Sequence, residues 1–591
     1  MSVRSLFVSS ILTISIAALG HTVRAQTAPD IPNADNSSPA SAIDQVSQPQ
    51  YEVIVEKNIP IVTRDGTTLY ADVYRPDASG KFPVLVAHAP YQKDIDEVFP
   101  KPVPGYPSRE MPMVSYFVPR GYAIVRVDPR GVGRSEGQFG IFTRLGAEDA
   151  YDTIEWSAQQ PWSTGKTSIG GGVGYYSIAS WLVAALRPPH LTTMLSWDGD
   201  ADIYRGLSYR GGIYFQQLGE YYENVAALQL LHDDPLYNRD GFTRNFIAET
   251  LQNSLVSDAI WEGRIPDLSK IDIPVLMTES WGVNTIHGRG NIEAYYRMRE
   301  MGKQNIKLRV HDNHNKMMYP GGCQQYGDHT CAFFSEEGLL EQLRWYDYWL
   351  KGIDTGVMDE PPVKLWVRSG PDSGVFRFEE DWPLPSTQWT KLYLSNAVAG
   401  VHDQSVNDGS LSLDASGDAD SVTFTAGPFA YARTLGMGLP TASFSTSPME
   451  NDQEVSGPIA LKLWVSSETT DMDIVAHVRD IAPDGSVDNL ADGWLKVSRR
   501  KLDHELTRKF RPFHTHDEEL KMVPGEIYEV EIEIWPISHV FKKGHRLWLD
   551  IDSSPGGFFK HARYKNGSTN TIYFGEGRRS YLLIPLIPAR K

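Results

Sequence analysis

The sequence predicts a doubly wound α/β domain followed by an all-β domain, and three observations support this fold class. Short apolar runs at 82–87, 122–127, 167–171, 192–197, 273–278 and 306–310 have the length of strands buried on both faces. Helical stretches such as 147–159 and 291–302 separate most of them, as in a parallel sheet with crossover helices. After about residue 361 the helices stop, and short strands of period two alternate with turns.

Length and composition are those of a multidomain globular protein. A chain of 591 residues is too long for one hydrophobic core. Its 41% hydrophobic and 22% charged residues are ordinary for such proteins. The net charge of -18 argues against nucleic acid or an anionic membrane as a partner.

The N-terminal 25 residues have the pattern of a signal peptide. Arg4 precedes an apolar run over 6–19, and Val23-Arg24-Ala25 supplies small residues for cleavage. The run is short for a bilayer span, so we expect no membrane span in the mature protein. Residues 26–50 are rich in Pro, Ser, Asn and Asp and predict a disordered leader. We therefore expect a periplasmic or secreted protein.

The expected domains follow from these patterns. Residues 51–360 form the α/β domain, which starts with alternating strands around the turn Asp65-Gly66. An insertion at about 201–270, rich in Tyr, Leu and Asn, has helical periodicity and lies where a lid covers the sheet edge. Residues 361–591 form a β-sandwich or jelly roll.

Only two cysteines occur, Cys323 and Cys331. In an exported protein a local disulfide is favoured over free thiols or a zinc site, because no histidine spacing typical of zinc accompanies them. Such a bond would hold one loop.

Several short motifs follow one another in an order that carries a family resemblance. They are Arg75-Pro76, His88-Ala89-Pro90-Tyr91, Asp128-Pro129-Arg130-Gly131, Trp162-Ser163-Thr164-Gly165-Lys166, a Trp-rich segment at 345–352, and Pro483-Asp484-Gly485. In this order they resemble the CocE/NonD (cocaine-esterase-like) hydrolases, which are relatives of X-Pro dipeptidyl peptidases and α-amino-acid ester hydrolases. The resemblance covers nearly all of the chain after residue 50.

The resemblance implies an α/β-hydrolase fold with a helical lid, followed by a jelly roll of the X-Pro dipeptidyl-peptidase C-terminal type. It implies a serine, a histidine and an acid that act on a small-molecule ester or amide or a short peptide, and no cofactor. A serine at a strand-to-helix elbow attacks the acyl carbon, and an oxyanion hole stabilises the intermediate.

The nucleophile position of this pattern is altered. The family elbow has the form G-x-S-Y-x-G, and the matching segment runs from Gly172 to Ser177, with Gly174 where the serine belongs. Glycine has no side chain and cannot attack. Ser177 lies about one turn into the helix, where a hydroxyl is usually structural, and is the alternative nucleophile.

The acid and histidine positions also depart from the pattern. Val283 stands where the family has its aspartate, and Glu279 at the end of the preceding strand is a substitute with different spacing. The histidine after the next strand matches His314 best and His311 second. Valine cannot orient an imidazole by hydrogen bonding.

The oxyanion elements match better. Tyr91 matches the family tyrosine whose hydroxyl donates one hydrogen bond, and the backbone N–H of Tyr175 supplies the other. A packed aromatic residue with a satisfied hydroxyl is the structural alternative for Tyr91.

Other polar clusters give weaker signals. Asp198, Asp200 and Asp202 resemble the start of a calcium loop, but no EF-hand glycine or glutamate follows, so turn chemistry is the better interpretation. His311 and His314, joined by His287, form a weak metal signal. The glycines at 170–172 lack the Lys-Ser/Thr of a phosphate loop. We expect no metal.

Two hypotheses of function remain open. The first is an exported acyl hydrolase of the CocE/NonD type with a non-standard site, and the second is an inert pseudo-hydrolase that binds a small molecule, peptide or partner. Tyrosines in the insertion suggest an aromatic pocket, but neither the substrate nor the oligomeric state is readable from the sequence.

Overall fold

The computed structural model describes residues 45–94, 110–229, 234–242, 246–281, 287–311, 332–371, 373–402, 405–415, 417–426, 441–553 and 568–589. Four residues singled out in the sequence lie outside these ranges: Val283, His314, Cys323 and Cys331.

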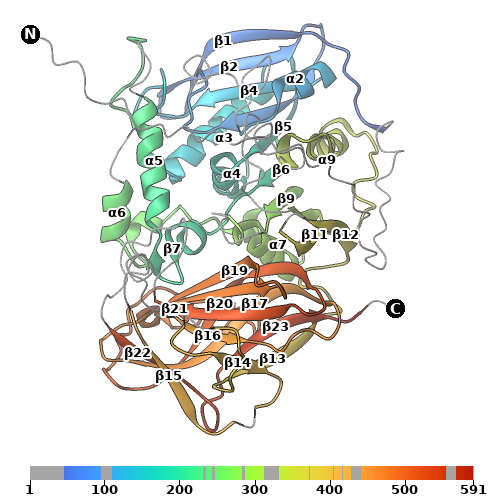
Figure 1. The fold of residues 1–591 in the computed structure, drawn as a ribbon. Coiled ribbons are helices and arrows are strands. Elements are labelled where there is room, and N and C mark those ends of the chain that lie inside the picture. The colour runs from blue at the N-terminus through green and yellow to red at the C-terminus, as the bar shows by residue number, and fades with distance from the viewer. Residues whose placement is uncertain are drawn as a thin grey trace, which may run out of the picture.

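The N-terminal part is built on one twisted sheet with helices on both faces (Figure 1). Its strand order is β1-β2-β4-β3-β5-β6-β9-β10-β11-β12. Strands β4 to β11 in this order run parallel, and β1, β2 and β12 are joined to their neighbours in antiparallel fashion. The strands are β1 (Val53–Val62), β2 (Thr68–Pro76), β3 (Phe82–His88), β4 (Ala123–Asp128), β5 (Ser163–Val173), β6 (Leu191–Trp197), β9 (Val275–Ser280), β10 (Ile306–His311), β11 (Val363–Gly370) and β12 (Ser373–Glu379).

Burial explains why the apolar runs form these strands. Every residue of β3, β4, β9 and β10 is buried, because helices cover both faces of the sheet. The helices and helical turns of this part are α2 (Val114–Phe117), η2 (Val118–Arg120), α3 (Arg144–Ala158), α4 (Tyr175–Ala185), α7 (Gly290–Glu300), η7 (Ala332–Phe334), α9 (Glu336–Tyr346) and η8 (Asp347–Lys351). The predicted α/β class is confirmed.

The insertion between β6 and β9 is mixed rather than purely helical. It contains η3 (Tyr204–Ser208), β7 (Tyr209–Arg210), β8 (Ile213–Tyr214), α5 (Gln216–Leu228), α6 (Phe246–Gln252), η4 (Ala259–Trp261) and η5 (Leu268–Lys270). Strands β7 and β8 pair as a small hairpin that leads into α5. In Figure 1, α5 and α6 stand at one side of the molecule, beside the α/β sheet.

The C-terminal part is a two-layered β-structure, which confirms the predicted all-β class. One layer joins β15, β22, β17, β23, β13 and β20, and the other joins β16, β21, β18 and β19. An apolar core lies between the layers. The strands are β13 (Gln388–Ser395), β14 (Gly409–Ser412), β15 (Asp420–Thr425), β16 (Ala442–Ser445), β17 (Gln453–Ser467), β18 (Asp473–Ile481), β19 (Val487–Lys496), β20 (Tyr528–Phe541), β21 (Arg546–Asp552), β22 (Thr569–Phe574) and β23 (Tyr581–Ile587), with the turn η9 (Val497–Arg499).

Two details differ from the sequence analysis. Residues 363–367 are predicted as the first strand of the C-terminal part, but β11, which contains them, pairs in parallel with β10 and extends the α/β sheet. The predicted leader reaches residue 50, yet the Ser47 N–H and hydroxyl donate to the Asp347 carboxylate at 2.6 and 2.7 Å. Both differences arise from tertiary pairing, which local composition does not encode.

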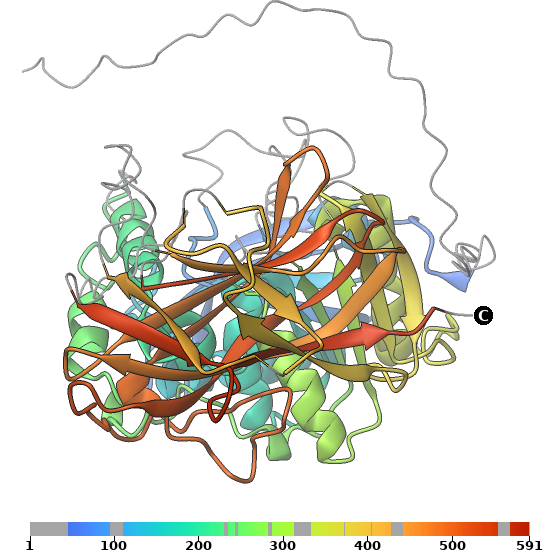
Figure 2. The same ribbon diagram turned by 60° about the horizontal axis from the view of Figure 1, so that its bottom comes forward.

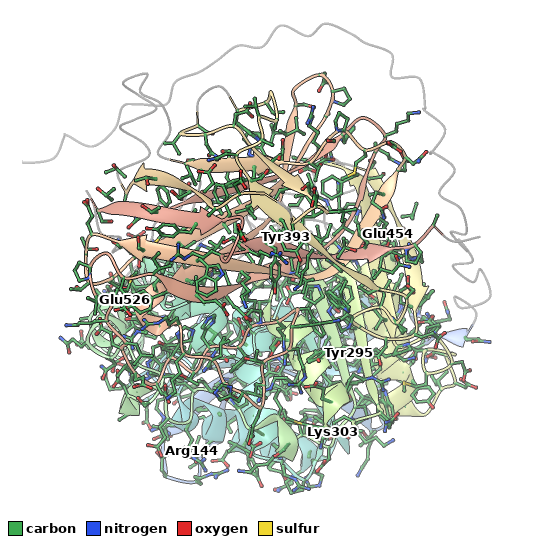
Figure 3. All side chains as sticks on the ribbon, turned by 90° about the horizontal axis from the view of Figure 1, so that it is seen from below. Arg144, Tyr295, Lys303, Tyr393, Glu454 and Glu526 are labelled. Carbon is green, nitrogen blue, oxygen red and sulfur yellow. The ribbon has the colours of Figure 1, made fainter. Side chains whose placement is uncertain are left out.

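The two parts are in close contact (Figures 1 and 2). Arg377 of β12 donates two hydrogen bonds to Glu454 of β17, at 2.7 and 2.8 Å. In Figure 3, Tyr295 of α7 lies on the α/β side and Glu454 on the β-rich side. None of the described helices is long and apolar enough to cross a membrane.

Candidate active site

Gly174 lies at the turn between β5 and α4, where the sequence places the nucleophile. Its φ of 62° and ψ of -115° are a conformation that favours glycine. The Gly174 N–H donates to the Trp197 carbonyl at 3.2 Å, and its own carbonyl accepts the Ile178 N–H at 2.9 Å. The turn thus has the backbone of a nucleophile elbow without the side chain.

His287 lies beside the position that a side chain at residue 174 would occupy. A β-carbon built on Gly174 would lie 3.6 Å from His287 Nε2, and this is the nearest atom outside its own neighbours. His287 is buried and lies immediately before α7, where its carbonyl accepts the Gly290 N–H at 3.0 Å. The sequence analysis considers His287 only as a third metal ligand. Its position in a glycine-rich loop outside the family pattern gave no signal of this proximity.

Tyr91, from the segment after β3, lies beside the start of α4. Its ring is 6.4 Å from that of Tyr175 and 5.8 Å from that of Tyr176. The Tyr221 hydroxyl on α5 donates to the Tyr91 hydroxyl at 3.4 Å. Burial raises the pKa of Tyr91 well above its usual value, with Tyr221 and Glu110 adding to the effect, so its hydroxyl is protonated.

The Tyr175 side chain is packed among other aromatic rings. Its ring stacks on Phe142 at 4.6 Å and meets Tyr222 edge-on at 5.9 Å. Phe139 lies 6.1 Å away. These rings pack around the start of α4, where the first backbone N–H groups lack helical partners.

A small cavity lies behind this aromatic cluster. It measures about 30 Å³ and is lined by His88, Phe139, Phe142, Tyr175 and Tyr176, among others. This is room for one water molecule and not for a substrate. Burial lowers the pKa of His88 to about 4, so its imidazole is neutral.

Ser177 is engaged in backbone hydrogen bonds. Its hydroxyl donates to the Gly172 carbonyl and accepts the Trp197 N–H, and the side chain is fully buried. The first bond closes the elbow on itself, and the second joins it to the end of β6. The hydroxyl that the sequence offers as an alternative nucleophile is therefore used to hold the turn.

His311 contacts Trp197 and Glu341. Its ring stacks on Trp197 at 5.1 Å, and its Nε2 lies 3.4 Å from the Glu341 carboxylate. Glu341 also accepts a hydrogen bond from Arg309 at 3.0 Å. These contacts give His311 a structural role, and His314 lies outside the described residues.

Glu279 is buried beside Asp198 and is poorly suited to orient an imidazole. Its carboxyl accepts the N–H groups of Ser280 at 3.3 Å and Asn291 at 3.2 Å. Burial and the neighbouring Asp198 raise the pKa of Glu279 well above its usual value. Burial beside Asp198 therefore disfavours the ionised carboxylate that would orient an imidazole. The other acid position, Val283, is not described.

The Asp198–Asp202 segment shows the turn chemistry expected from its sequence. The Asp202 N–H donates to Asp200 at 2.7 Å, and Asp202 forms an ion pair with Arg205 at 2.8 Å. Among the residues described, no group of three His, Cys, Asp or Glu side chains is arranged to bind a metal ion.

Comparison with known proteins identifies related families. Residues 65–314 match the family model of the X-Pro dipeptidyl-peptidase (S15 family). Residues 355–583 match that of the X-Pro dipeptidyl-peptidase C-terminal non-catalytic domain. The cocaine esterase of Rhodococcus sp. (strain MB1 Bresler) is 26% identical over 605 residues, which cover 90% of this chain and 98% of the esterase.

Solved structures agree with this relationship. A CocE/NonD family hydrolase from Staphylococcus aureus superposes with a TM-score of 0.77 at 29% identity, covering 91% of this chain and 94% of that chain. An aminopeptidase from a marine sediment thaumarchaeon shares the fold, with a TM-score of 0.66 at 16% identity over 95% of this chain and 99% of that chain. The chain belongs to the CocE/NonD family of X-Pro dipeptidyl-peptidase-like hydrolases.

Proposed function

We propose that this protein is an acyl hydrolase in which a water molecule replaces the serine nucleophile at the Gly174 elbow. The observation that carries the proposal is the 3.6 Å separation between His287 Nε2 and the position of an absent β-carbon at Gly174. The space left by the side chain lies beside His287, and the ring of Tyr91 lies 6.4 Å from that of Tyr175, the residue after Gly174.

The reaction follows from these positions. Water bound in the Gly174 space gives a proton to His287 Nε2 as its oxygen forms a bond to the acyl carbon. The carbonyl electron pair moves to oxygen, and the oxyanion accepts hydrogen bonds from the Tyr91 hydroxyl and the Tyr175 N–H. The intermediate then collapses, and the leaving alcohol or amine takes the proton from His287. No acyl-enzyme forms.

Such a site is slower than a complete triad. In subtilisin, loss of the serine lowers kcat by about 10⁶, and the oxyanion hole and binding alone retain roughly 10³–10⁴ over water. We therefore expect activated aryl esters to be hydrolysed more readily than unactivated amides.

The substrate class comes from the relatives and the charge of the chain. Their names specify an ester in the case of cocaine esterase and X-Pro peptides in the case of the matching family model. We propose a small aryl ester or a short peptide derivative as the substrate.

The test is hydrolysis of p-nitrophenyl esters and X-Pro p-nitroanilides by the wild-type chain, His287→Gln and His311→Gln. We expect steady turnover without an initial burst, loss of turnover in His287→Gln, and turnover in His311→Gln, because His311 pairs with Glu341 away from the elbow. Equal rates for His287→Gln and wild type would contradict the proposed base.

A second candidate function is that of an inert pseudo-hydrolase that binds a small molecule, peptide or partner protein. It is favoured by Gly174, which provides no nucleophile, and by Val283, which replaces the family acid. Calorimetric binding of esters or X-Pro peptides that are recovered intact after long incubation would support this function over hydrolysis.

We also propose that the chain is exported to the periplasm or secreted. The support is the signal-peptide pattern of residues 1–25 in the sequence. N-terminal sequencing of protein from the periplasmic fraction or medium should find a start after Ala25. An intact N-terminus on protein that stays in the cytosol would contradict export.

A further inference from the structure

Tyr221 on α5 contacts Tyr91, the side chain that donates a hydrogen bond to the oxyanion in the proposed mechanism. Its hydroxyl lies 3.4 Å from that of Tyr91 and is the donor, although the two residues are 130 positions apart. We propose that Tyr221 is a positioning residue that fixes the direction in which Tyr91 donates its proton. This inference rests on the proposed function, because it takes Tyr91 as an oxyanion donor.

The direction of the Tyr91 hydroxyl depends on how many protons the two phenols can donate. A phenol has one proton to donate, and its oxygen can also accept. Because Tyr221 gives its proton to the oxygen of Tyr91, the proton of Tyr91 points elsewhere. The rings of Tyr175 and Tyr176, which follow Gly174 at the elbow, lie 6.4 and 5.8 Å from the ring of Tyr91. Removing the Tyr221 hydroxyl takes this donor from the Tyr91 oxygen, so the rotation of the Tyr91 hydroxyl is less restricted.

The length of the bond agrees with a role during the reaction. At 3.4 Å it is longer than the usual ~2.7–2.8 Å between hydroxyl oxygens. Catalytic hydrogen bonds are often long in the absence of substrate and shorten in the complex. A chain of hydroxyls also polarises each member, which strengthens the bond to a developing negative charge.

The surroundings keep Tyr91 neutral and therefore able to donate. Tyr91 is 3% exposed. Burial, Tyr221 and Glu110 together hold its pKa well above the usual value. An ionised Tyr91 would repel an oxyanion, so this environment suits a donor at any working pH.

The helix that carries Tyr221 is held at its start by the C-terminal part. Arg210 precedes α5, and its guanidinium lies 4.1 Å from the ring of Phe215. It also lies 5.1 Å from Trp494 and 4.4 Å from Trp535 of the β-rich part. These cation–π contacts hold the N-terminus of α5 against the β-rich part. The adjacent Tyr222 packs edge-on against Phe142 at 5.6 Å. Tyr221 is thus presented to Tyr91 by a fixed helix.

Tyr221→Phe tests the proposal, because it keeps the ring and removes the donor. The control is Tyr209→Phe, which removes a buried hydroxyl of the same insertion that donates to the Thr250 carbonyl at 2.7 Å. For ester hydrolysis we expect Tyr221→Phe to lower kcat by about fivefold to tenfold with KM within about twofold, the effect of one hydrogen bond. Tyr209→Phe should leave both constants unchanged.

A binding measurement separates this proposal from the proposed function. Calorimetry compares an aryl phosphonate monoester, which is a tetrahedral anion, with the matching uncharged aryl ketone. We expect Tyr91→Phe and Tyr221→Phe to weaken phosphonate binding about fivefold to tenfold and to leave ketone binding unchanged.

The outcomes are distinct. If the wild-type chain hydrolyses nothing but Tyr221→Phe still weakens phosphonate binding selectively, the hydrolase function is wrong and the positioning role stands. If the ratio of phosphonate to ketone affinity in Tyr221→Phe equals that of wild type, or Tyr209→Phe changes it as much, the positioning role is wrong even in an active enzyme.

Discussion

Replacing Gly174 with serine introduces a nucleophile where the structure has room for one. The nearest atom to the new β-carbon is His287 Nε2 at 3.6 Å, an ordinary contact, so no clash opposes the change. The cost is backbone strain, because a φ of 62° with a ψ of -115° is unfavourable for residues other than glycine by about 1–3 kcal/mol. With about 2–4 °C per kcal/mol for a domain of this size, we expect Tm to fall by several degrees.

The reactivity of the variant follows from the same distance. A hydroxyl on that β-carbon reaches His287 Nε2 within about 2.6–3.2 Å, the range needed for proton transfer. We expect a fluorophosphonate probe to label Gly174→Ser and not the wild-type chain. Gly174→Ala is the matched control, because it has the same strain and no hydroxyl. Labelling should be slow, because loss of the orienting acid costs about 10⁴ in serine proteases. Gly174→Ser with Val283→Asp should exceed the sum of the single changes if His314 is the base.

The identity of the base decides whether this reasoning is correct. In the Gly174→Ser background, His287→Gln should abolish labelling and His314→Gln should leave it. Labelling that survives His287→Gln and disappears in His314→Gln would refute the assignment of His287. Labelling of the wild-type chain at another serine would refute the placement of the nucleophile.

Three further predictions concern other parts of the chain. Ser177→Ala should lower the free energy of unfolding by about 2–4 kcal/mol, since it leaves two buried backbone groups without partners; lost turnover at unchanged stability would instead make Ser177 catalytic. Burial raises the pKa of Asp200 to about 8. The contribution of Asp200 to the free energy of unfolding is therefore present below about pH 4 and is lost as the pH rises to 8. The free energy of unfolding in urea, taken as Asp200→Asn minus wild type, should therefore be more positive at pH 8 than at pH 5. An equal difference at both pH values would contradict the raised pKa. Cys323 and Cys331 should appear as a linked peptide pair in mass spectrometry of the oxidised protein, and two alkylatable thiols would contradict the bond.

Part of the site was predictable because its chemistry lies in contiguous residues. The strand, turn and helix around Gly174 follow from a local run of glycines between an apolar strand and an apolar helix. Tyr91 was recognisable from its motif, and the structure brings it to Tyr175. The residues at positions 174 and 283 can be read directly from the sequence, since each is a property of a single position.

The partners of each polar side chain were not predictable in this way. Local spacing allowed Ser177 as a nucleophile and His311 as a base. A hydroxyl close to the elbow in sequence fits the nucleophile position, and an imidazole just after the next strand fits the histidine position. In the folded chain the Ser177 hydroxyl bonds the end of β6, and His311 pairs with Glu341 of α9. These partners come from strands and helices that become neighbours only when the sheet is assembled.

The sequence by itself determined the α/β and all-β classes, the order of the strands along the chain and the glycine at position 174 of the strand-to-helix turn. Hydrophobic period and motif order are local properties of the sequence. Burial on one or both faces of a strand determines the spacing of its apolar residues, so the period indicates the class of strand. Only the tertiary structure decided that His287 faces the elbow and that Tyr221 reaches Tyr91. Both contacts join loops or helices more than 100 residues apart, and they exist because parallel strands bring their C-terminal ends to one edge of the sheet, where the insertion folds over them.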